Sequence, residues 1–577
     1  MKRMVAYLRP FIPRMTVGFT IKVLASLVEL AIPWILSYII DDLIPLSEIK
    51  PVIIWGGLMI VCSLLAWAGN VAANRMASAV ARDTTCQVRH DLFLKISYLS
   101  ERRVDELTIP SLISRMTSDT YVLHQTVGMI QRLGVRAPIM LIGGMIVTLT
   151  LDPVLTVIML ITLPIVFAIT YFVSRRGTRL FTKSQQASDH VLRVVRENVV
   201  GVRVIKALSK SGYERERFNG VNDTLSERER AAETTMALTN PAMSLILNLG
   251  IAAVIVAGAY RVQGGLTEVG KIIAFMNLFT IVLNALRAIN RMFTMLTKAA
   301  ASSARVLEVL DTPSELYETG PHYSFIPKDA PHIAFRNVTL RYKSGSFAVK
   351  DLDFELKRGE TLGIIGATGS GKSTVIRALM RYFDVFEGAV EIDGVDIRDY
   401  ATADLRAKFG VVFQNDTLFN DTIAENIRLG RDIPDERLLE AASWAQASEF
   451  IETQGGPEAP VAIKGANLSG GQKQRLLIAR ALAGDSEILV LDDSSSALDY
   501  KTDSLLREEI RKHCGNATKI IVAQRISSIM HADKILVMDN GRVIGMGTHD
   551  ELMQSCRIYC EISESQMGSR ARKGAKQ

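Results

Sequence analysis

The sequence predicts a six-helix α-helical transmembrane domain followed by an α/β domain built around a phosphate-binding loop. Hydrophobic residues make up 48% of the 577 residues, and up to about Ala300 they form long uninterrupted runs. Beyond about Pro331, short β-rich runs alternate with helical segments, which is typical of an α/β domain. One of these runs is followed by a complete G-x-x-x-x-G-K-[ST] motif. A chain of this length exceeds one hydrophobic core, so at least two domains are expected.

Six apolar segments each approach the ~20 residues that a helix needs to cross a bilayer. The predicted spans cover residues 17–40, 52–73, 130–150, 155–173, 243–262 and 272–296. The short connections 41–50, 151–153 and 261–271 are poor in Lys and Arg, whereas the long ones, 75–132 and 175–233, are rich in both charges. The positive-inside bias therefore places the long connections and both chain ends in the cytosol. We expect a multi-pass protein, with a bacterial cytoplasmic membrane as its location.

Two stretches inside the long connections, residues 108–119 and 201–218, mix a short apolar patch with charge. Each suits a small helix that docks onto another domain, and the alternative is a solvated hairpin tip. Glu29 lies inside the first predicted span, where an unpaired carboxylate is costly. It is expected either to contact a cationic substrate or to make a structural hydrogen bond near Pro33.

The domain boundaries follow from composition. Residues 1–304 are expected to form the transmembrane domain with cytosolic helix extensions, 305–330 a Pro- and Gly-containing linker, 331–567 the α/β domain, and 568–577 a disordered basic tail. The net charge of +7 is compatible with nucleic-acid binding, but Lys and Arg cluster beside the apolar spans and no nucleic-acid motif accompanies them. We therefore expect no nucleic-acid partner. The five cysteines lack C-x-x-C spacing and indicate reduced thiols.

The phosphate-binding loop predicts a nucleoside triphosphate site of the P-loop NTPase type. Its glycines let backbone N–H groups converge on phosphates at the start of a helix. Lys372 is expected to neutralise the β- and γ-phosphates, and Ser373 to hold Mg²⁺. The apolar strand 488–493 ends in two carboxylates, and the first of them, Asp492, is expected to contact Mg²⁺ directly or indirectly. The expected cofactor-binding residues of the loop are Gly366, Thr368, Gly369, Ser370, Gly371, Lys372, Ser373 and Thr374.

Between the loop and the acidic strand lies the sequence LSGGQ, residues 468–472. In that order the three motifs resemble the ATP-binding cassette (ABC) family, and with six spans ahead of them the whole chain looks like a half-transporter of a multidrug-type ABC exporter. The resemblance implies that two cassettes pair head to tail, so that one chain's LSGGQ covers the ATP of the other. It implies that Tyr342 stacks on adenine and that Gln414 senses Mg²⁺. It also implies that segments 108–119 and 201–218 are coupling helices. The implied signature contacts are Ser469, Gly470, Gly471 and Gln472.

Three positions depart from the family pattern. Asp493 stands where the family has the Glu that positions the attacking water, Gln524 replaces the switch His, and Ile463 replaces a Glu before LSGGQ. The shorter side chain sets the carboxylate back by roughly 1.5 Å, and a misplacement of ~1 Å can cost ~10²-fold in rate. Glutamine can bond a γ-phosphate but carries no imidazolium charge. With Gln414, Asp493 and Gln524 form the expected catalytic set, and it predicts slow hydrolysis.

These departures predict a heterodimer, in which this chain lends its intact LSGGQ to a partner half-transporter that keeps the Glu and the His. The alternative is that both variants are tolerated in a working homodimer. The expected function is ATP-driven export of a small hydrophobic or amphipathic compound by alternating access. A lipid flippase, a peptide exporter or a siderophore carrier would share the fold. A soluble cassette ATPase acting on nucleic acid is a remote alternative that the six apolar spans oppose.

Overall fold

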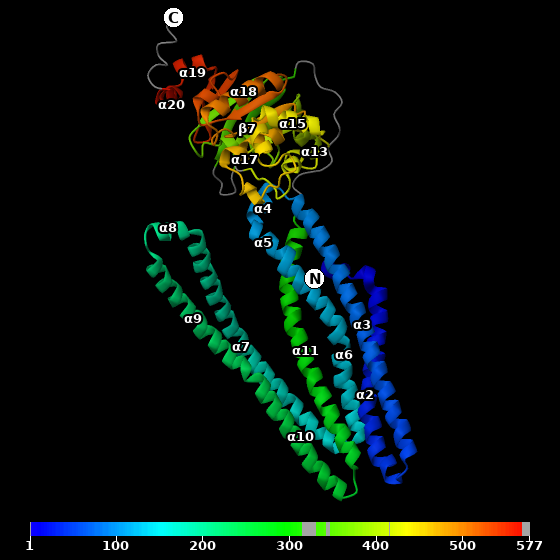
Figure 1. Ribbon diagram of the computed structural model, residues 1–577. Helices are drawn as coiled ribbons and strands as arrows, with labels where there is room; N and C mark the ends of the chain where they lie inside the picture. Colours follow the sequence, from blue (N-terminus) through cyan, green and yellow to red (C-terminus); the bar gives the residue numbers. More distant parts are fainter. Residues whose placement is uncertain (1, 314–329, 342–346, 415, 568–577) are drawn as a thin grey trace. The chain divides into compact units, whose positions relative to one another are not determined.

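The computed structural model describes residues 2–313, 330–341, 347–414 and 416–567. The chain divides into two compact units (Figure 1). The membrane unit comprises Met1–Ser97 and Ile109–Thr312, and the α/β unit comprises Tyr98–Thr108 and Pro313–Gln577. This confirms the predicted fold class, a helical membrane part followed by an α/β part.

Among the described residues, six helical stretches of the membrane unit are long and apolar enough to cross a bilayer, and each contains one of the six predicted spans. The count of six is therefore confirmed. In α3 and α7 the helix extends far beyond its apolar part, as the long charged connections predicted. The main helices are α2 (Ile12–Tyr38), α3 (Ile49–Ser97), α6 (Thr120–Leu151), α7 (Pro153–Val200), α9 (Ser211–Ala237), α10 (Thr239–Gln263) and α11 (Val269–Leu310).

The helices of the membrane unit pack in two groups. Helix α2 lies against α3, and α11 packs along α6, while α7 and α9 run side by side as a separate pair (Figure 1). A buried apolar cluster that includes Met159, Phe275 and Phe279 joins α7, α10 and α11. Gly250 of α10 permits this approach, because a Cβ there would lie 2.6 Å from the Phe279 ring. At the α6–α7 turn, Asp152 caps α7.

The predicted linker begins too early. Helix α11 continues to Leu310, so residues 305–310 are helical. Arg305 donates to Asp119 through Nε at 2.9 Å, and Glu308 pairs with Arg115 at 2.8 Å. Asp119 and Arg115 belong to η4 (Arg115–Asp119), directly before α6. The charges of Arg305 and Glu308 made this segment look like a linker. The local sequence does not show that Asp119 and Arg115 of another segment neutralise them.

The first predicted turning point is also displaced. The chain reverses at α4 (Glu101–Leu107), which clusters with the α/β unit and ends at Thr108 with a φ of +63°. Residues 109–119, α5 (Ile109–Ser114) and η4, already begin the helical run that becomes α6. The second prediction, 201–218, contains the short helix α8 (Val202–Ala207), but α9 begins at Ser211. The remaining short helices are α1 (Lys2–Ala6), η1 (Arg9–Phe11), η2 (Ile39–Leu43) and η3 (Ile44–Leu46).

The described residues of the α/β unit form two sheets, with strand orders β2-β1-β4-β5 and β10-β9-β3-β8-β7-β6. The first is antiparallel; in the second only β10 is antiparallel to its neighbour. Every residue of β7 (ILVLD) is buried, as expected for a strand inside a parallel sheet. The strands are β1 (Ile333–Arg341), β2 (Phe347–Leu356), β3 (Thr361–Gly366), β4 (Glu387–Ile392), β5 (Val395–Asp396), β6 (Phe409–Val412), β7 (Ile488–Asp492), β8 (Thr518–Val522), β9 (Lys534–Asp539) and β10 (Arg542–Gly547).

The carboxyl ends of β3 and β7 meet at one edge of the larger sheet, which brings the phosphate-binding loop and Asp492 together. Three helices follow the motifs of the nucleotide site: α12 (Lys372–Leu379) follows that loop, α17 (Gly470–Leu482) follows LSGGQ, and α18 (Tyr500–His513) follows the acidic strand and the segment after it. The others are α13 (Thr402–Ala407), α14 (Ile423–Arg428), α15 (Asp435–Trp444), α16 (Ser448–Thr453), η5 (Ile463–Gly465), η6 (Ile526–Ser528), α19 (His549–Ser555) and α20 (Arg557–Met567).

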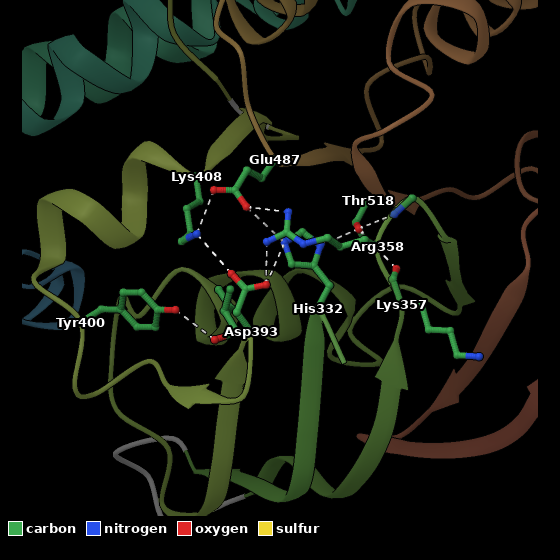
Figure 2. Close-up of polar contacts among 10 residues, drawn as sticks. His332, Lys357, Arg358, Asp393, Tyr400, Lys408, Glu487 and Thr518 are labelled. Carbon is green, nitrogen blue, oxygen red and sulfur yellow. Dashed lines mark hydrogen bonds and ion pairs between the residues drawn. The ribbon is translucent and has the colours of Figure 1, made fainter. Parts of the chain in front are cut away.

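An ion-pair network lies at the opposite edge of the larger sheet, where β3 and β7 begin, and includes residues beside β1 and β4 of the smaller sheet (Figure 2). Arg358 contacts Asp393 at 2.7 Å and Glu487 at 2.8 Å, and Lys408 contacts the same carboxylates at 3.3 and 2.8 Å. His332 Nε2 lies 3.8 Å from Asp393 and 3.7 Å from Glu487, a grouping compatible with a metal ion. Because two cations already neutralise the two carboxylates, we interpret the network as a structural clamp.

The clamp predicts a pH dependence of stability. His332 is buried, and its Nδ1 lies 2.6 Å from Thr518 Oγ1. Burial, followed by the charge of Arg358, lowers the pKa of His332. Below its ordinary pKa of about 6.5 the unfolded chain therefore binds the proton more readily, and stability falls as pH decreases. Hydrogen bonds from Lys408 and Arg358 overcome burial and lower the pKa of Glu487, whose contribution is lost only below about pH 4.5.

We expect His332→Gln to reduce the loss of thermal stability between pH 7.5 and 5.5, measured as Tm of the full chain in detergent. Each kcal/mol lowers Tm by roughly 2–4 °C in a domain of this size, which is measurable. The control is His90→Gln, because His90 is exposed. His549 is not suitable as a control, because it contacts Tyr559. The same pH slope in wild type and His332→Gln would contradict the assignment.

Candidate nucleotide site

The phosphate-binding loop connects the end of β3 to the start of α12, and its glycines are required by its geometry. Gly369 and Gly371 have φ values of +83° and +100°, in the left-handed region that disfavours a side chain. A Cβ on Gly371 would lie 2.8 Å from the Ala348 carbonyl oxygen, and one on Gly366 would lie 2.1 Å from that of Met538. The backbone can therefore pass where a larger residue would clash.

Lys372, the first residue of α12, folds back over the loop. Its Nζ donates to the carbonyl oxygens of Gly366 at 2.9 Å and Ala367 at 2.8 Å. Burial lowers the pKa of Lys372, and the charges of Asp492 and Asp493 oppose that shift. The ammonium therefore lies between the loop carbonyls and the acidic strand end, where a phosphate oxygen would meet it.

A pocket of about 150 Å³ gathers most of the predicted residues. Gly366 and Ser370 do not line this pocket. The Ser370 side chain is buried, and the backbone carbonyl oxygen of Ser370 accepts a hydrogen bond from Gly541 N at 3.2 Å. Tyr342 lies outside the described residues. The predicted residues that line the pocket are Thr368, Gly369, Gly371, Lys372, Ser373, Thr374, Gln414, Asp492, Asp493 and Gln524.

Ser373 and Asp492 offer oxygen ligands to a metal ion. Asp492 ends β7 and is only 3% exposed. Burial raises the pKa of Asp492, and a hydrogen bond with Ser373 opposes this rise. A hydroxyl and a carboxylate in contact, beside a phosphate-binding loop, fit the oxygen-ligand preference of Mg²⁺. The chemistry of this pair is therefore compatible with the predicted metal site.

The three predicted catalytic residues lie together at the same edge. Gln524 Nε2 donates to Asp493 Oδ2 at 2.9 Å, and Gln414 also forms a hydrogen bond with Asp493. Burial raises the pKa of Asp493, whereas the Gln524 hydrogen bond lowers it. The backbone of Asp493 has a φ of +51°, and its N–H donates to Val522 O at 2.9 Å. The carboxylate is thus engaged by neutral amides on two sides.

The LSGGQ segment forms the start of α17 and does not line this pocket. Ser469 Oγ accepts from Gln472 N at 3.3 Å, and Gln472 Oε1 accepts from Ser469 N at 2.8 Å, a complete capping box. Ser469 and Gly470 are exposed. The segment therefore presents an ordered helix N-terminus on the surface, as a head-to-tail cassette pair requires.

Two contacts were not anticipated from the sequence. Gln474 accepts from Ala497 N at 2.9 Å and donates to Ser496 Oγ at 3.0 Å, which ties LSGGQ to the segment after the acidic strand. In the membrane unit, Glu29 pairs with Arg136 Nη2 at 2.6 Å. The charge of Arg136 inside a predicted span was the available signal, but its pairing with another helix could not be inferred.

Comparisons with known proteins agree with this arrangement. Residues 15–286 match the model of the ABC transporter transmembrane region, and residues 349–496 match that of the ABC transporter. The chain is 34% identical over 572 residues to the uncharacterized ABC transporter ATP-binding protein YfiB of Bacillus subtilis, covering 98% of this chain and 99% of YfiB. It is 30% identical over 510 residues to a fatty acid ABC transporter ATP-binding/permease protein of Mycobacterium bovis, covering 88% and 80%.

The fold also matches a solved structure, that of a bacterial Atm1-family ABC exporter with ATP bound. The TM-score is 0.81 at 25% sequence identity, and the match covers 99% of each chain. Family models therefore match both parts of the chain, and a full-length fold match joins them in the same order. The chain belongs to the ABC transporter family: it is a multi-pass exporter half-transporter whose transmembrane domain is fused to an ATP-binding cassette that couples ATP hydrolysis to transport.

Proposed function

We propose that this chain is one half of a heterodimeric exporter, and that its own nucleotide site binds Mg²⁺-ATP but hydrolyses it slowly. In this assignment the phosphate-binding loop and Lys372 hold the phosphates, and Ser373 and Asp492 hold Mg²⁺. The exported compound is hydrophobic or amphipathic, and the cassettes and both chain ends are cytosolic. The observation that carries the proposal is the hydrogen bond from Gln524 to Asp493.

The residues joined by that hydrogen bond weaken the site in two ways. The Asp493 carboxylate is shorter than glutamate, and amides of Gln524 and Gln414 occupy it, so it is poorly placed to accept a proton from an attacking water. Gln524 is neutral and cannot add positive charge at the γ-phosphate. A homodimer would carry this defect in both sites, whereas a heterodimer needs only one competent site.

The intact LSGGQ supports the same conclusion. Its capping box and the Gln474 contacts keep residues 469–472 ordered although the neighbouring catalytic set is altered. In the head-to-tail arrangement this segment covers the partner's ATP, so the chain contributes to hydrolysis through its signature segment. The partner is then a second half-transporter with the glutamate and the histidine.

A path for coupling starts at the nucleotide loop. Arg377 lies on α12, directly after the loop, and its guanidinium is 3.5 Å from Glu101 of α4. Both residues belong to the α/β unit, although α4 connects α3 to α5 of the membrane unit. We propose that α4 and α8 are the coupling helices through which closure of the cassettes reorients the transmembrane helices.

ATP turnover of the purified chain, alone and with the half-transporter encoded by a neighbouring cassette gene, tests this proposal. We expect the lone chain to turn over at least ~10²-fold more slowly than the pair. Vanadate-trapped ADP should accumulate at the partner's phosphate-binding loop only. Fast hydrolysis by the lone chain, or equal trapping at both loops, would show that Asp493 and Gln524 are tolerated variants in a homodimer.

The name of one relative favours a particular class of cargo. That relative is a fatty acid transporter, so an acyl chain with an anionic headgroup is a second candidate beside neutral multidrug-type compounds. A substrate-stimulated ATPase screen with oleate and with neutral amphiphiles separates the two.

A further inference from the structure

A lysine is buried in the membrane unit, and among the described residues its ammonium bonds to amides and to no carboxylate. Lys22 of α2 is 3% exposed, and its Nζ donates to Asn70 Oδ1 at 2.7 Å and Asn74 Oδ1 at 3.1 Å. Both partners are neutral amides of α3. Lys22 lies within the first predicted span, where an ionised group is costly and usually functional. If this position had only a structural role, an apolar side chain would fill it at a lower free-energy cost.

Lys22 belongs to a group of charges that is net positive. The charges that act on its ammonium are those of Arg136, Glu29 and Arg132. Glu29 is already paired with Arg136, and Arg132 Nε donates to the Gly128 carbonyl oxygen at 3.0 Å. We call Lys22, Glu29, Arg132 and Arg136 the basic cluster. It contains three cations and one carboxylate, so the described residues leave two positive charges unbalanced.

The basic cluster also has unused hydrogen-bonding capacity. Ser26 is fully buried on α2, one turn after Lys22, and its Oγ has no hydrogen-bond partner among the residues that the structure describes. The same is true of Glu29 Oε2 and Arg136 Nε. The Arg136 side chain is nevertheless 39% exposed, so a ligand can reach the cluster. Buried polar groups without partners are uncommon and call for an explanation.

The position of the cluster along the helices suits a lipid headgroup. At 1.5 Å per residue, Lys22 lies about 8 Å beyond the start of its predicted span, and Arg132 and Arg136 about 3 and 9 Å beyond the start of theirs. A groove of about 640 Å³ includes Asn74, the partner of Lys22, and is also lined by Arg75 and His124. The groove follows α3 past the end of its predicted span at residue 73, and Arg82 adds a further basic side chain to its lining.

We propose that the basic cluster binds the negatively charged headgroup, a carboxylate or a phosphate, of an amphiphilic substrate. Two unbalanced cations and a free hydroxyl match an anion that brings acceptor oxygens. The acyl part lies in the hydrophobic region of the bilayer or of the transporter, so only the headgroup needs polar contacts. The inference rests on the proposed export function and specifies its substrate class.

Binding of [¹⁴C]oleate to the full transporter pair in nanodiscs, without ATP, tests the inference. Three lipids compete with oleate: monooleoylglycerol is neutral, oleylamine is cationic, and lysophosphatidate carries a phosphate. Sodium acetate and inorganic phosphate are tested as free anions without an acyl chain. We expect oleate and lysophosphatidate to compete at least about tenfold better than the neutral and cationic lipids, and the free anions not to compete. Equal competition by monooleoylglycerol, preference for oleylamine, or competition by the free anions each overturns the inference.

Substitutions locate the site. Lys22→Met and Arg132→Gln should each weaken oleate binding about tenfold, and Lys22→Arg should retain it. Arg132 contacts only a backbone carbonyl oxygen among its described hydrogen bonds, so its variant remains informative if Lys22→Met fails to fold. Lys50→Met, at an exposed lysine near the start of α3, is the matched control and should bind oleate normally. Normal oleate binding by a folded Lys22→Met or Arg132→Gln overturns the assignment.

Failure of this inference is distinguishable from failure of the proposed function. A pair that hydrolyses ATP and transports a compound, but shows no preference for anionic lipids, contradicts only the headgroup assignment. A pair that binds oleate through Lys22 and Arg132, but has equal ATP turnover at both loops, contradicts only the asymmetric heterodimer.

Discussion

Asp493→Asn leaves the ATP turnover of the heterodimer within about twofold, whereas replacing the corresponding carboxylate of the partner reduces it at least ~10²-fold. The reason is geometric. In this chain Asp493 has a shorter side chain than glutamate and a backbone φ of +51°, and its carboxylate accepts a hydrogen bond from Gln524 at 2.9 Å. It therefore contributes little to positioning water. Turnover is measured on pairs purified in sequence through a different affinity tag on each subunit, which selects complexes that contain both.

The matched control restores the glutamate and the histidine that the family has at positions 493 and 524. The double variant Asp493→Glu with Gln524→His should raise turnover of the lone chain by at least about tenfold, because it restores the longer carboxylate and an imidazole. Lys372→Ala in the same background should remove this gain by weakening phosphate binding. Equal losses from the carboxylate substitutions in the two subunits would contradict the asymmetric site.

Gly471→Asp in this chain nearly abolishes turnover of the pair, a loss of ~10²-fold or more, while the equivalent change in the partner's signature segment has a small effect. Gly471 lies in the first turn of α17, where backbone N–H groups and the helix dipole favour an anion. A carboxylate there would repel the γ-phosphate of the ATP bound by the partner. A Cβ at Gly471 would also lie 3.2 Å from the Ala497 carbonyl oxygen.

The control for that variant is the partner's own glycine, since its signature segment covers the slow site. ATP binding, measured by equilibrium binding of a fluorescent ATP analogue, should persist in both variants because the phosphate-binding loops are unchanged. If the two signature substitutions reduce turnover equally, the two nucleotide sites contribute equally and the heterodimer proposal is wrong.

The sequence determined the architecture and most of the nucleotide site. Long apolar runs must become spans because a bilayer offers no hydrogen bonds to an exposed backbone, and the described part of the chain contains six helices that are long and apolar enough. The phosphate-binding loop was predictable because its function depends on local backbone geometry, and Gly369 and Gly371 have the required positive φ values. Asp492, Asp493 and Gln524 were identified from short motifs and line the same pocket.

Only the tertiary structure decided which charges pair. The composition of residues 305–310 predicted a linker, but they are helical and Arg305 pairs with Asp119. The first turn is α4, which lies before the predicted segment 108–119. Glu29 joined Arg136 across helices, and Gln524 reached Asp493 from 31 positions away. The physical reason is that hydropathy and backbone preference act over a few residues, whereas the energy of an ion pair or a buried hydrogen bond depends on partners that packing brings from distant parts of the chain.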